Sequence, residues 1–278
     1  MRQDILVPLV TYPDAGSAAI AGQAIKVAAY LGRDIHGIVL DVDIPDVSNL
    51  VSRLLIDLPD LIRKTEAESR MKGAALLKAL EAAAGAAGVR FTGETLASEP
   101  ALFGDHAAAK ARYHDLALVG MDRTNATARM VAEGILFGSG RPALLMPEAA
   151  AAGGLDRIAI AWDGSRVAAR AVADAAPFLE KSSEIAVLTV TDEKPLADGD
   201  AGGRLAARLV EKGFAARPVS VRREGRAIAA ALQAEAEELG AGLLVMGGYG
   251  HSRLRDFVLG GATEGVLSEL AMPVLLSH

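Results

Sequence analysis

Glycines crowd one stretch near the end of the chain, and this stretch holds the residues best suited to chemistry. It runs from Met246 to Gly265 and reads MGGYGHSRLRDFVLGGATEG. Glycine tolerates positive φ and lets the backbone approach a ligand closely. Backbone N–H groups in such loops, and at helix N-termini, attract phosphate oxygens. The stretch therefore predicts a polyphosphate-binding loop, and the competing interpretation is that its glycines only form tight turns.

Other arrangements that could support catalysis are missing from the sequence. The five histidines show no metal-ligand spacing, and the chain has no cysteine for a thiolate site. It contains no Gly-x-Ser-x-Gly elbow and no Walker sequence. We therefore predict no catalytic residues and no metal ligands.

Short apolar segments alternate with helical patterns along the whole chain. Continuous apolar runs such as Ile185–Val190 are typical of parallel strands buried on both faces. Alternation with helices predicts right-handed crossovers and a parallel sheet. A long helix is expected from Leu61 to about Ala87, after the second strand. The predicted strands are 4–9, 35–42, 89–95, 115–120 and 142–146, then 157–162, 184–190, 217–222, 242–247 and 273–277.

The two halves of the sequence resemble each other. Segments 4–9 and 157–162 both begin a half, and segments 115–121 and 241–247 match further on. Each half also closes on a proline followed by an apolar strand. Small residues around 148–154 suit a linker. We therefore expect an α/β fold of two tandem five-stranded parallel-sheet sandwiches of Rossmann-like type, with domains at 1–150 and 155–278.

Composition excludes several classes of protein. The hydrophobic share of 51% and the charged share of 23% are those of a globular protein, not of a disordered one. A net charge of -6 argues against a general nucleic-acid binder. No apolar run is long enough to span a bilayer, and the N-terminus does not resemble a signal peptide. We expect a cytoplasmic protein without membrane or nucleic-acid partners.

The glycine-rich stretch resembles the ATP-binding signature of the universal stress protein family, which is Gly, two residues, Gly, nine residues, Gly, then Ser or Thr. Gly247, Gly250 and Gly260 lie at its three glycine positions. The turn Trp162-Asp163-Gly164-Ser165 resembles the family's Asp-Gly-Ser turn after the first strand. The resemblance is strong over 157–276, weak over 1–147, and implies an adenine-nucleotide-binding fold of the alpha-hydrolase-like type.

The resemblance also implies which residues bind the nucleotide. The first-strand turn would contact adenine and ribose, and Asp163 would accept a hydrogen bond there, unless it serves instead as a helix N-cap. The second strand's end would flank the base, and the glycine loops would hold ribose and phosphates. The implied set is Ala161, Trp162, Asp163, Thr189, Val190, Met246, Gly247, Tyr249, Gly250, Gly260, Gly261, Ala262 and Thr263.

Some residues depart from the family pattern. Gly261 replaces the usual hydroxyl residue, which removes a hydrogen bond worth roughly 1–3 kcal/mol to a charged partner. Trp162 would either stack on the base or fill its pocket. In the first half Arg123 replaces the second glycine, and Asp122 adds a negative charge. That half is therefore expected to be nucleotide-free.

Family members commonly pair their fifth strands across a dimer. By analogy, segment 142–146 is expected to pair with segment 273–277 and form an intramolecular pseudo-dimer. A further homodimer and an unidentified protein partner remain open.

Three functions were compared. The favoured one is a stress-response or regulatory module that binds ATP, with or without Mg²⁺, in its C-terminal domain and hydrolyses it slowly at most. The alternative is a nucleotide-free structural or protein-interaction module. The third is an adenylyl-transfer or amidation enzyme, against which the missing Ser-Gly-Gly-x-Asp-Ser and His-x-Gly-His motifs argue.

Overall fold

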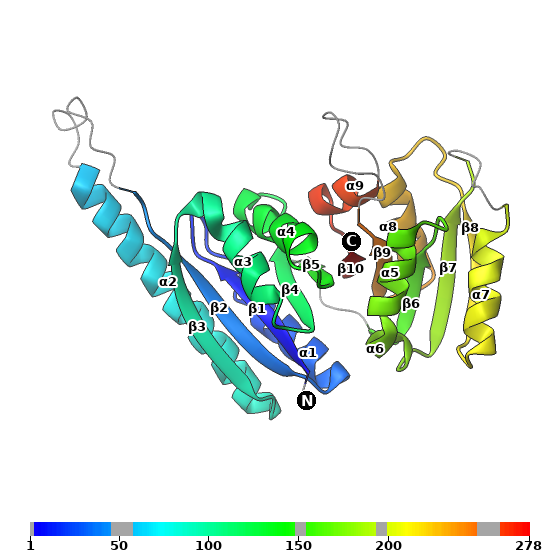
Figure 1. Cartoon of the computed structure of the whole chain (residues 1–278), viewed down its shortest axis with the longest axis horizontal. Coiled ribbons are helices and arrows are strands. Elements are labelled where there is room, and N and C mark those ends of the chain that lie inside the picture. Colours follow the sequence, from blue (N-terminus) through cyan, green and yellow to red (C-terminus); the bar gives the residue numbers. More distant parts are fainter. Residues whose placement is uncertain (1–2, 46–57, 148–153, 193–198, 249–261) are drawn as a thin grey trace. The chain divides into compact units, whose positions relative to one another are not determined.

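The computed structural model describes residues 3–45, 58–147, 154–192, 199–248 and 262–278. The chain forms two compact units, Met1–Ser139 and Gly140–His278. Figure 1 shows that both consist of a sheet with helices packed against it.

The N-terminal unit contains a parallel sheet in the order β3-β2-β1-β4. Its strands β1 and β2 are buried over most of their length, which agrees with their continuous apolar sequence. The strand bounds are Asp4–Val10 for β1, Asp34–Val42 for β2, Phe91–Ser98 for β3 and Leu116–Met121 for β4.

Four helices cover this sheet. Helix α1 (Ala19–Leu31) packs against α2 (Leu58–Ala87), and α3 (Phe103–Ala111) packs against α4 (Ala126–Gly138). Helix α2 also lies along β2 (Figure 1). Gly32 ends α1 at φ 68°, a left-handed conformation that glycine adopts without steric cost. A short 3₁₀ turn, Pro100–Leu102, precedes α3.

The C-terminal unit contains a sheet in the order β5-β10-β9-β6-β7-β8. All pairs are parallel except β5 and β10, which pair antiparallel with Leu144 opposite Leu275. The bounds are Ala143–Pro147 for β5, Arg157–Ala161 for β6, Glu184–Val190 for β7, Ala216–Val221 for β8, Leu243–Gly247 for β9 and Val274–Ser277 for β10.

Helices follow the strands of this unit as well. Helix α5 packs on β9 and β10, α7 packs on β7 and β8, and α8 packs against α9. The bounds are Arg166–Asp174 for α5, Ala176–Leu179 for α6, Ala201–Glu211 for α7, Ile228–Glu238 for α8 and Ala262–Ser268 for α9.

The structure confirms the predicted fold class. Each half of the sequence contributes five strands, and the predicted pairing of 142–146 with 273–277 is confirmed as the antiparallel β5–β10 pair. By its contacts β5 belongs to the C-terminal unit. The domain boundaries at 150 and 155 stay a prediction. Among the helices that the structure describes, none combines the length and apolar character needed to cross a membrane.

Candidate functional site

The strand order of the C-terminal unit defines where a ligand would bind. Chain connections run outward from β6 in both directions, first to β7 and β8, then back past β6 to β9 and β10. The order therefore reverses between β6 and β9. Open α/β sheets bind ligands at the carboxyl ends of the strands that flank such a reversal. Trp162 follows β6, and Gly247 ends β9.

The backbone of Trp162 is held by the neighbouring strand β7. Its N–H donates to the Leu188 carbonyl at 2.8 Å, and its carbonyl accepts from the Thr189 hydroxyl at 3.3 Å. Ala161 and Trp162 are both half-buried. The backbone N–H of Trp162 is therefore used, and its indole ring and the second lone pair of its carbonyl are left to contact a ligand.

Asp163 shapes the turn that follows β6. Its Oδ1 accepts the Ser165 N–H at 2.9 Å, and Gly164 takes φ 77° between them. Ser165 is the N-cap of α5, since its hydroxyl accepts the Ala168 N–H at 3.2 Å. The alternative that Asp163 caps this helix is therefore wrong. Asp163 is exposed, so its carboxylate is accessible to a ligand.

Thr189 and Val190 end β7 beside this turn, and both are half-buried. The first turn of α7 packs closely on them. A Cβ added to Gly202 would lie 2.5 Å from Thr189 Oγ1, so glycine is required for the helix to come this close. Ala201 lies next to the turn as well, 3.8 Å from a Cβ placed on Gly164. Strand β7 and helix α7 thus form one wall of the edge.

Gly247 ends β9 directly beneath the first turn of α5. A Cβ there would meet the Ala168 nitrogen at 2.6 Å and the Val167 carbonyl carbon at 2.7 Å. Both atoms belong to the backbone, so neither can move away cheaply. Met246, just before it, is 4% exposed and belongs to the core. The sequence interpretation missed this packing role of Gly247.

The C-terminus is bound to the end of β9. Gly248 donates its N–H to the Ser277 carbonyl at 2.7 Å, and its own carbonyl lies 2.9 Å from His278 Nδ1. The chain is thus anchored to β10 at Gly248, near the start of the glycine-rich stretch. The sequence carried no signal for this role of His278, because the contact depends on strand order.

The remaining predicted residues fall partly outside the structure. Tyr249, Gly250, Gly260 and Gly261 lie outside the described residues. Ala262 and Thr263 open helix α9, where Ala262 is half-buried and Thr263 is 5% exposed. Ala161, Trp162, Asp163, Thr189, Val190, Met246 and Gly247 all lie at the carboxyl ends of three neighbouring strands.

One more carboxylate organises this edge. Asp192 follows β7, and its oxygens accept the Arg223 N–H at 2.9 Å and the Glu224 N–H at 3.0 Å. These backbone hydrogen bonds, that of Arg223 first, hold the pKa of Asp192 below its ordinary value. Asp192 therefore ties the loop after β8 to the end of β7. Within the ranges that the structure describes, no three His, Cys, Asp or Glu side chains are grouped to hold a metal ion.

The carboxyl edge of the N-terminal unit is organised differently. Thr11, at the end of β1, donates to the Leu40 carbonyl at 2.7 Å and lies 2.6 Å from the hydroxyl of Ser69 in α2. Ser69 also accepts the Val42 N–H at 2.9 Å. Thr11 and Ser69 are 1% and 2% exposed. Helix α2 thus covers the ends of β1 and β2 and uses their polar groups.

Polar groups in the loop after β4 also form hydrogen bonds with each other. The Asp122 carboxylate accepts both the N–H and the hydroxyl of Thr124 at 3.0 Å. Asn125 caps α4 by accepting the Ala128 N–H at 2.9 Å. A carboxylate therefore occupies the loop that corresponds to the glycine-rich stretch of the other unit.

Strand order and crossover helices define a doubly wound α/β protein, and the residues at the strand reversal are a candidate ligand site. Residues 154–278 match the model of the Universal stress protein family. Residues 154–278 are therefore a domain of the universal stress protein family.

Two solved structures share this fold over nearly the whole chain, and a third match covers about half of it. A universal stress protein from Archaeoglobus fulgidus DSM 4304 is 18% identical, with 99% of this chain and 95% of that chain covered and a TM-score of 0.68. A Pseudomonas aeruginosa UCBPP-PA14 protein assigned to the family is 18% identical, with 99% and 93% covered and a TM-score of 0.58. An Arabidopsis thaliana family protein with AMP bound is 14% identical, with 52% and 91% covered and a TM-score of 0.34. No curated protein matches the sequence.

Proposed function

We propose that the C-terminal domain binds an adenine nucleotide, ATP in particular, at the carboxyl ends of β6, β7 and β9, and that the protein acts as a cytoplasmic stress-response regulator. One observation carries the proposal: the family's glycine signature begins at Gly247, and Gly247 lies at the strand reversal where Trp162, Asp163 and Thr189 also gather.

The residues at this edge fit the parts of a nucleotide. The exposed Asp163 carboxylate would accept a hydrogen bond from ribose, and Thr189 and Val190 would flank the base. The N–H groups of the stretch from Gly247 to Thr263 would hold the phosphates. Mg²⁺, where present, would be bound by the phosphates and would neutralise part of their charge. Any hydrolysis would be slow, because the sequence contains no recognisable catalytic motif.

The N-terminal unit would have a supporting role. We propose that residues 1–150 are a degenerate domain of the same family that binds no nucleotide. Helix α2 covers the ends of β1 and β2, and the Asp122 carboxylate lies in the loop after β4. A negative charge there disfavours a phosphate. The β5–β10 pair lies within the C-terminal unit and adds a strand to its sheet.

A second candidate function has its own supporting observation. Gly247 is required for packing against α5, and Gly265 for packing against Ala229, whose Cβ would lie 2.6 Å from an added Cβ. Two glycines of the stretch thus have structural reasons that involve no ligand. On this interpretation the protein is a nucleotide-free module for protein interaction.

A binding titration separates the two functions. Trp162 is the only tryptophan of the chain, so its fluorescence reports on the proposed site directly. We expect ATP, ADP and AMP to change this fluorescence with saturation, and GTP to bind more weakly. Gly250→Val should abolish the change, because a branched side chain blocks the approach of phosphate to the backbone.

The matched control is Gly85→Val in α2, where an added Cβ meets nothing within 4 Å. It should bind nucleotide as the wild type does. Absence of saturation up to millimolar ATP, checked by equilibrium dialysis, would remove the nucleotide proposal and favour the interaction module.

A further inference from the structure

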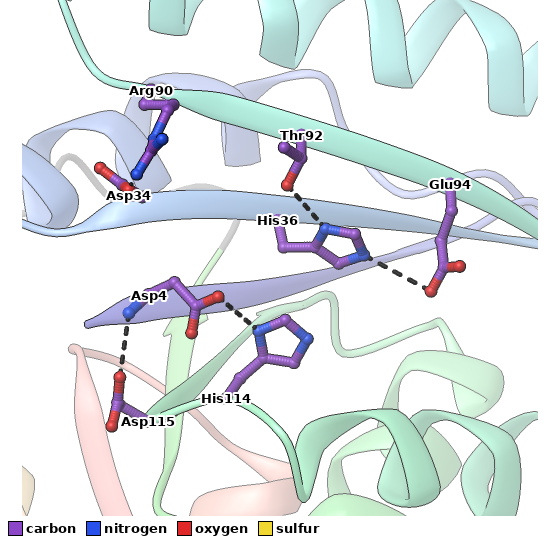
Figure 2. A network of polar contacts seen from close by, with 8 residues as sticks. All are labelled: Asp4, Asp34, His36, Arg90, Thr92, Glu94, His114 and Asp115. Carbon is purple, nitrogen blue, oxygen red and sulfur yellow. Dashed lines mark hydrogen bonds and ion pairs between the residues drawn. The ribbon is translucent and has the colours of Figure 1, made fainter. Parts of the chain in front are cut away.

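Two histidines that are far apart in the sequence stack on each other in the N-terminal unit. His36 lies on β2, and His114 lies in the turn between α3 and β4. Their ring centroids are 5.0 Å apart, and the ring planes differ by 19°. Figure 2 shows the pair among the strands β1, β2 and β3. The two side chains are 19% and 12% exposed, so solvent reaches both only in part.

Each ring has its own carboxylate partner. His36 Nε2 lies 3.4 Å from Glu94 Oε1, and His114 Nδ1 lies 3.0 Å from Asp4 Oδ2 (Figure 2). The other nitrogen of His36, Nδ1, lies 2.8 Å from the Thr92 hydroxyl. A proton on either ring would therefore lie beside a negative charge.

The charged side chains around the histidine pair carry one more negative than positive charge. The carboxylates around the pair are Asp4 on β1, Asp34 on β2, Glu94 on β3 and Asp115 after the turn. Three cations lie around the pair within the described residues. Lys110 is ion-paired with Glu94 at 2.6 Å, Arg90 is ion-paired with Asp34 at 2.9 Å, and Arg33 faces Asp4 and Asp115. Four negative charges thus face three positive ones, so a single added proton balances the network.

Glu94 keeps its charge while the histidines titrate. The hydrogen bond from Lys110 holds the pKa of Glu94 below its ordinary value, and His36 adds to the same effect. The carboxylate therefore remains available to the His36 ring through the pH range in which imidazoles gain protons.

The stacking decides how many protons the pair accepts. A charged ring is attracted to the π face of a neutral ring. Two charged rings at the same separation repel each other in a poorly hydrated site. We propose that His36 and His114 form one proton-binding site that takes up a first proton readily and a second only with separation of the rings, which gives the N-terminal unit a pH-sensitive contact between β2 and the α3–β4 turn.

Nuclear magnetic resonance of the histidine rings in the full-length protein tests this proposal. We expect the ring signals of His36 and His114 to titrate in two steps that share the same midpoints and lie at least about one pH unit apart, a tenfold difference in proton affinity. In His36→Asn, His114 should titrate in one step between those midpoints, and His114→Asn should do the same to His36.

The internal controls are His106, which bonds to Ser98, and His278, whose signals should titrate unchanged in both variants. Independent single-step curves for the two rings would overturn the proposal, and so would two-step curves that survive replacement of the other ring. If one variant does not fold, the other still decides, because each variant removes one ring of the pair.

Discussion

Packing against helix α5 requires a glycine at position 247, whether or not a ligand binds there. An added Cβ would press on backbone atoms of Val167 and Ala168 at 2.6–2.7 Å. Gly247→Ala should therefore destabilise the C-terminal unit by roughly 1–3 kcal/mol, the usual cost of overpacking. Urea unfolding measures the change. Gly22→Ala in α1, where a Cβ meets nothing within 4 Å, is the control and should not destabilise. An unchanged stability in Gly247→Ala would contradict the contact.

A second residue-scale prediction concerns Asp41, whose carboxylate lies inside the N-terminal unit. The residue is 6% exposed, and its Oδ1 has no hydrogen-bond partner among the described residues. Burial raises the pKa of Asp41, and the Arg70 charge and the Ser69 hydroxyl offset only part of this effect. The folded state therefore binds this proton more tightly than the unfolded state does.

Because the folded state binds the Asp41 proton more tightly than the unfolded state, the free energy of unfolding depends on pH. The stabilising contribution of the neutral carboxyl is complete below the unfolded pKa, near 4, and is lost as the pH rises through the higher folded pKa. Asp41→Asn should remove this loss, so its stability relative to wild type should rise from pH 4 to pH 7 in urea unfolding. Asp60→Asn, at an exposed position on α2, should show no such trend. Parallel curves for Asp41→Asn and wild type would refute the assignment.

At the scale of elements, the two units share a device that places a helix on its sheet. Gly73 of α2 lies against Val39 and Asp41 of β2, and Gly202 of α7 lies against Val187 and Thr189 of β7. In both units a glycine of the helix faces a valine and the polar residue two positions after it, on β2 in one unit and on β7 in the other. The comparison of the halves by sequence missed this similarity, since isolated glycines in helices carry no such signal.

Gly73→Ala tests this device. The added Cβ would press on Val39 Cγ1 and come within 2.8 Å of Asp41 Oδ1, so α2 must move away from β2. We expect a loss of roughly 1–3 kcal/mol in urea unfolding. Gly85→Ala in the same helix meets nothing and should gain roughly 0.5–1 kcal/mol, because alanine favours helix over glycine. Equal effects of the two variants would show that α2 is not packed at Gly73.

The strands could be predicted from the sequence because buried strands consist mainly of apolar residues. All ten predicted segments overlap observed strands, and β7 runs over Glu184–Val190 as expected. Parallel strands covered by helices on both faces are apolar throughout, which is a strong local signal. The positions of Trp162, Asp163, Thr189 and Gly247 followed as well, since they depend on where strands end.

Contacts between distant segments were not predictable in the same way. The His36–His114 stack requires β2 to lie beside the α3–β4 turn, and no local pattern encodes that. The covering of β1 and β2 by α2 depends on Ser69 and Thr11, two ordinary polar residues whose burial only the fold reveals. Sequence reasoning identified the elements and the strand ends, and tertiary packing determined the rest.

At the scale of the whole molecule, strand β5 does not pair according to its position in the sequence. It is the last strand of the N-terminal half of the sequence, yet it pairs with β10, and both strands are fully buried. Without β5, the backbone groups of β10 that face away from β9 would be left unpaired. Exposed apolar edge strands are templates for association.

Two fragments of the C-terminal half make this testable. The fragment 140–278 retains β5 and should unfold cooperatively as a monomer in urea. The fragment 154–278 spans the residues matched by the family model and lacks β5, so it should be less stable and should self-associate through β10. Analytical ultracentrifugation measures the association. Monomers of equal stability from both fragments would show that β5 is dispensable for the C-terminal unit.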